Sequence, residues 1–203
     1  VSSSGVYPSM HYRIFMLLLT GLFLVSAAQA APSQKRFDDW QVTCNNQNFC
    51  VARNVGDHKG LVMTLSRSAG AHVDVNLRID LGTLDNAADS TPPVADRMLL
   101  DGEPLALGAG KWQITPHHLR TDDPDTINAF LARIQESQAI SLHGGQNNIS
   151  LLGLKAALLF VDAQQKRVGN ETAWIKKGNE PSLSVPPAPA LKAVTITNPT
   201  PTP

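Results

Sequence analysis

Apolar and polar residues alternate in the first half of the chain. Every second residue from Val73 to Ile79 is apolar, and polar residues stand between them. This period of two is the pattern of a β-strand with one buried face. Other short β-rich runs are separated by turn residues, so together they predict an antiparallel sheet. Its strands are expected over residues 40–44, 50–54, 61–67 and 72–79.

The sequence between residues 84 and 123 predicts loops and short strands. Residues 84–96 are polar and contain two adjacent prolines, which is typical of a loop. A hairpin is expected next, with Asp101 and Gly102 in its turn. One more strand is predicted over residues 112–115, followed by a second loop over residues 116–123.

Two helices are predicted in the second half of the chain. Apolar residues at 127, 130, 131 and 134 lie on one face of a helix that begins near Asp123 or Thr126. Ser150 is a suitable N-cap for a second, largely apolar helix over residues 151–167, and Gly169 is expected to end it. A last strand is predicted over residues 172–176. These elements predict a single α+β domain, in which an antiparallel sheet packs against two helices.

Both ends of the chain depart from this pattern. The apolar run from Ile14 to Val25 precedes Ala28 and Ala30, which predicts a secretory signal peptide over residues 10–30. Residues 1–9 are then an upstream extension, and the apolar run is too short for a good transmembrane span. Residues 179–203 are rich in proline and predict a linker or tail, which leaves residues 31–178 for the folded domain.

The balance of charge limits the kind of partner. The chain has 17 Lys and Arg residues against 17 Asp and Glu residues, so its formal net charge is +0. Without a basic excess, we expect no binding to nucleic acid. We predict an exported, periplasmic protein that is monomeric and has no stable membrane insertion after signal cleavage.

Cys44 and Cys50 are the two cysteines of the chain, and they flank an Asn-rich interval between two predicted strands. In an oxidising compartment such a pair predicts a disulfide that closes a hairpin. The alternative is a redox-active or metal-binding pair, but the spacing is not that of Cys-x-x-Cys. We therefore expect a disulfide-stapled sheet.

The three tryptophans fall in predicted strands and are expected to fill the core. They are Trp40, Trp112 and Trp174. If all three stood on one exposed face, they would instead suit a carbohydrate or peptide platform.

A cluster of polar residues near the end of the second predicted helix is the first candidate binding site. It contains Asp162, Gln165, Arg167 and Glu171. Arg167 in such a cluster can bind a small anion or a peptide carboxylate. The alternative is structural, because an internal ion pair and helix-capping bonds need the same residue types.

His117, His118 and Asp122 form a second candidate site, for a metal ion, with Asp123 and Asp125 close by in the sequence. Adjacent residues on a strand point to opposite faces, so both imidazoles reach one ion only if the chain turns sharply there. The alternative is an acidic helix start with exposed histidines.

Two stretches of the chain carry a family resemblance. The first is Phe37-Asp-Asp-Trp-Gln-Val-Thr-Cys with a second cysteine at 50, and the second runs from Ser150 to Gly178. Together they resemble the bacterial family called domain of unknown function 1176, over residues 35–178. The resemblance implies an exported protein without an assigned activity, which continues past a proline-rich linker into a second, cysteine-containing half.

The Trp-x-Val-x-Cys hairpin and the late Leu-x-Gly-x-x-Ala-Ala helix also resemble invasion-associated locus B proteins, over two short patches. Those are small exported proteins linked to host-cell entry and stress survival. This second resemblance implies a binding module and transfers no catalytic residue.

The chain contains no catalytic motif such as Gly-x-Ser-x-Gly. We therefore expect a non-catalytic binding or interaction protein of the Gram-negative periplasm, which needs no cofactor and binds an envelope protein or a small ligand. One alternative is an envelope hydrolase or metal-dependent enzyme that uses His117 and His118. Another is an inhibitor or chaperone of an envelope enzyme, which would insert a loop such as 45–49 or 143–148 into its partner.

Overall fold

The computed structural model describes residues 31–56, 60–82 and 92–191. The predicted extension (1–9), the predicted signal peptide (10–30) and the end of the predicted tail (192–203) lie outside the described residues. Two antiparallel sheets and two α-helices confirm the predicted α+β fold. In the described ranges, no helix is both long and apolar enough to span a bilayer.

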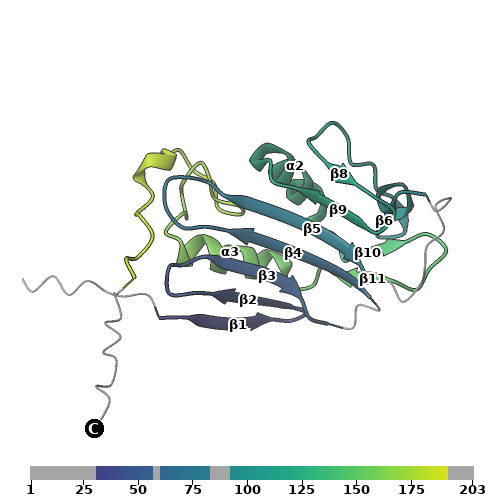
Figure 1. Ribbon diagram of the computed structural model, residues 1–203, viewed down its shortest axis with the longest axis horizontal. Coiled ribbons are helices and arrows are strands. Elements are labelled where there is room, and N and C mark those ends of the chain that lie inside the picture. Colours follow the sequence, from purple (N-terminus) through teal and green to yellow (C-terminus); the bar gives the residue numbers. More distant parts are fainter. Residues whose placement is uncertain (1–30, 57–59, 83–91, 192–203) are drawn as a thin grey trace, which may run out of the picture.

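The larger sheet has seven strands in the order β1-β2-β3-β4-β5-β9-β8 (Figure 1). Strands β2, β3 and β4 coincide with predicted strands, whereas β5 begins three residues later than predicted. The strands are β1 (Ser33–Phe37), β2 (Trp40–Cys44), β3 (Cys50–Asn54), β4 (Leu61–Arg67), β5 (Val75–Leu81), β8 (Gln113–Ile114) and β9 (His118–Thr121).

The smaller sheet has four strands in the order β11-β10-β6-β7. The predicted hairpin joins β6 to β7, and its turn residues Asp101 and Gly102 have φ angles of 51° and 88°. Positive φ at both positions is what a tight two-residue hairpin turn requires. The strands are β6 (Met98–Leu100), β7 (Glu103–Pro104), β10 (Ala139–Leu142) and β11 (Asn148–Ser150), and the short 3₁₀ helix η1 (Val94–Arg97) precedes them.

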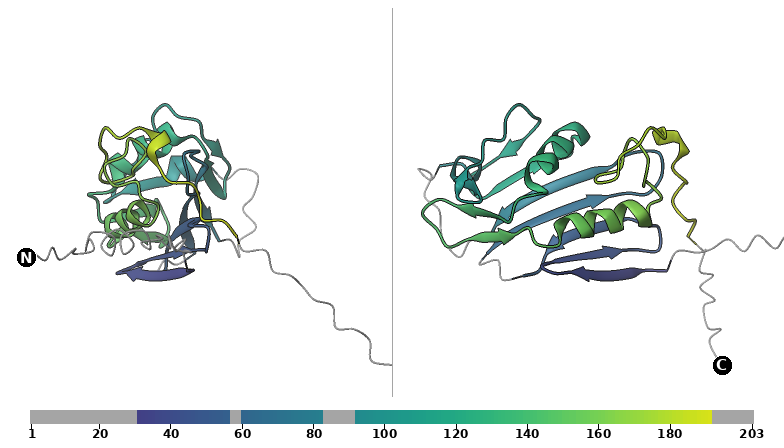
Figure 2. Two further views of the ribbon diagram at one scale, coloured as in Figure 1. Left: turned by 90° about the vertical axis from the view of Figure 1, so that its left-hand side faces the viewer. Right: turned by 180° about the vertical axis from the view of Figure 1, so that it is seen from behind.

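Two helices, α2 (Pro124–Ile134) and α3 (Leu154–Gln164), lie on one face of the larger sheet (Figure 2). The predicted start of α2 is confirmed, because the Asp123 carboxylate accepts a hydrogen bond from the Thr126 N–H at 3.0 Å. The apolar stripe of α2 is buried. Helix α3 packs against β1, β2 and β3, whereas α2 packs against β5.

Alternation along the strands positions the core between the larger sheet and the helices. In β4, every second residue from Leu61 to Arg67 is buried and the residues between them are only partly covered. Trp40 is fully buried, and its indole N–H donates to the Ser150 carbonyl at 2.9 Å. Trp174 is buried too, and Trp112 packs edge-on against Phe130, but neither of these two lies in a strand.

The second helix is shorter than predicted. Ser150 belongs to β11, and the N-cap of α3 is Gly153, with a φ of 92°. The helix ends at Gln164 because Lys166 adopts a left-handed φ of 57°, and the Arg167 N–H then donates to the Asp162 carbonyl at 2.7 Å. Gly169 therefore does not end the helix.

Three further predictions of local structure are wrong. Residues 172–176 form turns and bends instead of a strand, because the N–H groups of Trp174 and Ile175 donate to the Asp162 carboxylate. The predicted loop over 116–123 contains strand β9, and the predicted loop over 143–148 ends in strand β11. Both strands are short, so the sequence contains little alternation to mark them.

The predicted tail is partly packed against the domain in its described portion. Residues Ser182–Ser184 form the 3₁₀ helix η2, and Val185 is buried. The Asn170 side-chain amide donates to the Pro181 carbonyl at 2.8 Å and holds this segment. The folded unit therefore extends beyond residue 178, where the composition changes.

The predicted disulfide is confirmed. Cys44 and Cys50 are opposite residues of β2 and β3, and their sulfur atoms are bonded. Between them, the Asn45 side chain accepts hydrogen bonds from the N–H groups of Gln47 and Phe49, at 2.9 and 3.0 Å. The disulfide thus closes a loop that also has its own hydrogen bonds.

Replacing both cysteines by alanine is expected to lower the free energy of unfolding by about 2 kcal/mol, because the closed loop is short. For a chain of this size, that loss corresponds to a fall in melting temperature of roughly 4–8 °C. Thermal unfolding followed by circular dichroism measures it, and reduction of the wild-type protein should give the same shift. A double variant that is unfolded at 25 °C would show that the disulfide holds the whole domain and not only the hairpin.

Candidate functional site

Three of the four residues in the predicted binding cluster meet at the C-terminal end of α3. Asp162, Gln165 and Arg167 are all buried. Glu171 is not part of this group, because its side chain is exposed and accepts a hydrogen bond from the Ser182 N–H at 2.7 Å. The structure therefore brings together the helix residues and separates Glu171 from them.

Arg67 completes this cluster and was not among the predicted site residues. It lies at the end of β4 and is fully buried. Its guanidinium donates to Asp162 Oδ1 and to Gln165 Oε1, both at 2.7 Å, and stands 3.9 Å from the centre of the Trp174 ring. We call this group, formed by Arg67, Asp162, Gln165, Arg167 and Trp174, the arginine clasp.

The Asp162 carboxylate accepts three hydrogen bonds from the protein itself. Besides Arg67, it accepts hydrogen bonds from the N–H groups of Trp174 at 2.9 Å and Ile175 at 2.8 Å. Burial lowers the pKa of Arg67 to about 10, and the nearby Asp162 carboxylate opposes this effect. Arg67 therefore stays protonated at neutral pH and forms a buried ion pair.

The other two polar members of the clasp bind loops of the sheet. Arg167 donates to the carbonyl groups of Ser68 at 3.1 Å and Gly70 at 2.7 Å, and burial lowers its pKa. The Gln165 amide donates to the Asn48 carbonyl at 2.8 Å, within the disulfide-closed loop. The clasp thus ties the end of α3 to two turns of the larger sheet.

Nearly all polar groups of the clasp are hydrogen-bonded to other parts of the chain. The members of the clasp are buried, and both terminal nitrogens of the Arg167 guanidinium donate within the chain, whereas its buried Nε has no hydrogen-bond partner among the described residues. This geometry gives the clasp a structural role. The burial of Arg67 could have been predicted from the sequence, because Arg67 continues the alternation of the buried residues Leu61, Met63 and Leu65.

The metal candidates lie around the β8–β9 hairpin. His118 is in β9, and its Nδ1 atom is 3.1 Å from Thr115 Oγ1, whereas Asp122 is exposed. Among the residues that the structure describes, no group of three or more His, Cys, Asp or Glu side chains is arranged to hold a metal ion. The geometry at His117 and His118 therefore gives no support to a metal-dependent activity.

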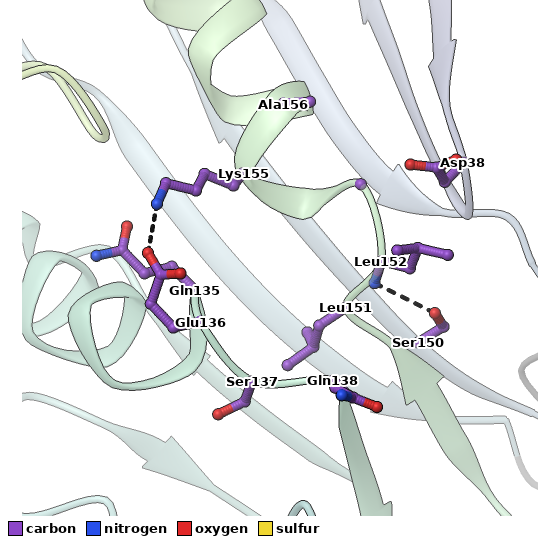
Figure 3. Close-up of a pocket in the computed structure, with 11 residues that line it drawn as sticks. Asp38, Gln135, Glu136, Ser137, Gln138, Ser150, Leu151, Leu152, Lys155 and Ala156 are labelled. Atoms are coloured by element: carbon purple, nitrogen blue, oxygen red, sulfur yellow. Dashed lines mark hydrogen bonds and ion pairs between the residues drawn. The ribbon is translucent and has the colours of Figure 1, made fainter.

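Three hollows lie one after another along α2, and neighbouring hollows share lining residues. The first, of about 660 Å³, is between the end of α2 and the start of α3 (Figure 3). It shares Gln135 with a second hollow of about 640 Å³, which in turn shares Asn128 and Trp174 with a third of about 230 Å³. We call the three together the α2 groove.

One wall of the α2 groove is a single stripe of α2. Asp125, Asn128, Ala132 and Gln135 line it, and their spacings of three, four and three residues place them on one side of a helix. With a rise of 1.5 Å per residue, this stripe is about 15 Å long. The groove is therefore long enough for a short extended molecule.

Charges of both signs surround the α2 groove. Asp125 and Glu171 line its hollow at the start of α2, and Lys176 and Lys177 line the next one. In the hollow at the other end of α2, Lys155 forms an ion pair with Glu136 (Figure 3). The groove offers amides, carboxylates and ammonium groups to a ligand, with Trp174 between the two charged regions.

Comparisons with known proteins identify relatives but no activity. The model of a family described as "Protein of unknown function (DUF1176)" matches residues 34–203. The "Uncharacterized protein YpfG" of Escherichia coli (strain K12) is 66% identical over 194 residues, which cover 96% of this chain and 56% of that protein. The chain thus spans little more than half the length of this relative. No solved structure matches it significantly.

Proposed function

The chain belongs to the DUF1176 family of proteins of unknown function, and we propose that it is an exported, non-catalytic binding protein whose α2 groove accommodates a short peptide segment. The observation that carries this proposal is the series of three hollows along one stripe of α2. Asn128 and Gln135 on that stripe each offer donors and an acceptor, as an extended peptide backbone requires.

The distribution of charge around the groove supports a peptide with free ends. Its amino group would lie near Asp125 and Glu171, and its carboxylate near Lys176 and Lys177. An uncharged ligand would leave these groups unused, so a zwitterionic molecule fits better. A chain of four residues is about 13 Å long when extended, which is close to the length of the stripe.

Two features support export. The Cys44–Cys50 disulfide is typical of an oxidising compartment. The pattern of residues 10–30, with an apolar run followed by small residues, favours secretion, and the periplasm is the compartment that fits both features.

A non-catalytic role is supported by the hydrogen bonding of Asp162 and Arg167, the buried polar residues that could otherwise act on a substrate. Asp162 and Arg167 are engaged in the arginine clasp, where their partners are other parts of the chain. The α2 groove contains charged and amide side chains, which bind and orient a ligand.

Isothermal titration with tetra-alanine, whose termini are free, tests the proposal. We expect wild-type protein to bind it, and Ala132→Trp to weaken binding at least tenfold because the indole would fill the groove. The matched control is Ala129→Trp, since Ala129 is exposed on the same helix but lines none of the three hollows. Equal affinity of the two variants, or no binding by the wild-type protein, would rule the groove out as a peptide site.

A further inference from the structure

The register of the larger sheet places four arginines in one row across its strands. Residues paired along this row run from strand β1 through β2, β3, β4, β5 and β9 to β8. The row is Arg36, Gln41, Arg53, Thr64, Arg78, Arg120 and Gln113 in order across the sheet. We call it the arginine row.

The arginine row stands on the face of the sheet that the helices leave open. Directly opposite residues of paired strands point to the same face. In β4, Thr64 lies between the buried Met63 and Leu65, so the row points away from the core. The two helices cover the opposite face, which leaves the row in contact with solvent (Figure 2).

Little negative charge balances the row. Among the described strand residues on this face, Asp80 is the one carboxylate, and it forms an exposed ion pair with Arg78 at 3.2 Å. Within the described ranges, Arg53 and Arg120 form no ion pair. The formal net charge of the whole chain is +0, but the strand residues of this face include four arginines and one aspartate, so the face is basic.

One pair of positions in the row carries like charges. Arg78 and Arg120 are directly opposite each other on β5 and β9. Like charges at opposite positions destabilise a sheet. Asp80 already compensates Arg78 in part, and an anion bound at Arg120 would remove the remaining repulsion, so the pair favours a negatively charged ligand.

The spacing of the row fits a linear polyanion. Neighbouring strands are about 4.8 Å apart, so Arg36, Arg53 and Arg78 follow one another at roughly 10 Å. A polypeptide in the polyproline II conformation repeats its side-chain direction every three residues, about 9 Å along the chain. Carboxylates at every third position would therefore face successive arginines.

Other polyanions fit this face less well. The described strand residues of the face include no Phe, Tyr or Trp, which single-stranded nucleic acids use for base stacking. The neighbouring row on one side is neutral, with Thr43, Val51, Ser66 and Asn76, and the row on the other side contains Val62, Asp80 and His118. The positive charge is thus confined to a line, whereas a membrane surface is attracted by a broader basic patch.

We propose that the arginine row binds an extended acidic polypeptide segment of a partner protein, with carboxylates paired to the guanidinium groups. This site lies on the opposite face from the α2 groove and does not depend on it. Because the paired charges are exposed, binding should weaken as ionic strength rises.

Fluorescence anisotropy with a labelled 12-residue peptide, in which glutamate follows every two prolines, tests the proposal on the full chain. We expect Arg53→Gln combined with Arg78→Gln to weaken binding at least tenfold. The matched control is Lys35→Gln combined with Arg133→Gln, which removes the same charge elsewhere, because Lys35 is paired with the buried Val42 and Arg133 lies on α2. The control should change the affinity less than twofold, and circular dichroism should show that both double variants are folded at the assay temperature.

Three results would overturn the proposal. The first is equal weakening by the two double variants, since that would reflect net charge alone. The second is no binding of the acidic peptide by the wild-type protein at 50 mM salt. The third is tighter binding to a thymidine 12-mer or to phosphatidylglycerol vesicles than to the peptide, which would make the occupant a nucleic acid or a membrane.

Discussion

Replacing Asp162 by alanine is expected to lower the free energy of unfolding by roughly 3–5 kcal/mol, which is typical when one partner of a buried ion pair is removed. The substitution leaves the Arg67 guanidinium buried without its counter-ion. It also removes the acceptor for the N–H groups of Trp174 and Ile175. Urea unfolding followed by circular dichroism measures the loss.

The matched control for Asp162→Ala is Glu136→Gln, which removes an exposed ion pair with Lys155. Exposed pairs contribute at most about 1 kcal/mol, so this variant should stay close to the wild-type protein. Replacing Arg67 by methionine in the Asp162→Leu background should recover part of the loss, because no buried charge remains. Similar costs for Asp162→Ala and Glu136→Gln would contradict the structural role of the clasp.

Gly153→Ala is expected to be the second most damaging change. Gly153 has a φ of 92°, and an added Cβ would overlap the Phe37 carbonyl oxygen in the turn between β1 and β2. The left-handed backbone and the overlap together should cost roughly 2–5 kcal/mol. Beside this overlap, the Asp39 N–H donates to the Leu152 carbonyl at 3.2 Å. This hydrogen bond limits how far the β1–β2 turn can move away from an added Cβ.

Gly144→Ala separates the cost of the left-handed backbone from the cost of the steric overlap. Gly144 also has a positive φ, of 75°, but an added Cβ would meet nothing within 4 Å. Its cost should therefore be the backbone term alone, about 1–2 kcal/mol. Thermal and urea unfolding of both variants provide the comparison, and equal costs would show that the start of α3 does not pack tightly against the β1–β2 turn.

Local patterns predict the hairpin strands because each of them has an alternating sequence and a nearby partner. Strands β2, β3 and β4 have the expected bounds, and the Asp123 cap of α2 is where its sequence indicates. Prediction fails after α3, where residues 172–176 have the composition of a strand. There the Asp162 carboxylate replaces a neighbouring strand as the acceptor for backbone N–H groups.

The clasp and the arginine row depend on pairings that no local pattern contains. Arg67 and Asp162 are 95 positions apart, and their contact requires α3 to pack against β1, β2 and β3 with its C-terminal end close to the end of β4. Likewise, Arg36, Arg53, Arg78 and Arg120 show no periodicity along the chain, and only the strand register aligns them. A composition with balanced charges could therefore not indicate a basic face.

The α2 groove could be predicted only in part. The buried stripe of α2 follows from its periodicity, and the stripe that lines the groove is another side of the same helix. Its second wall comes from residues 171–177, whose path depends on the clasp. The groove is therefore a consequence of tertiary structure, and the clasp contributes to it by fixing that wall.

The most direct test of this account is a map of the amide signals that change in an NMR titration with tetra-alanine. We predict that the side-chain amide signals of Asn128 and Gln135 shift, whereas that of Gln165 in the buried clasp does not. Shifts confined to Gln165 and its neighbours, or no shift at either position, would contradict a binding protein that uses the α2 groove.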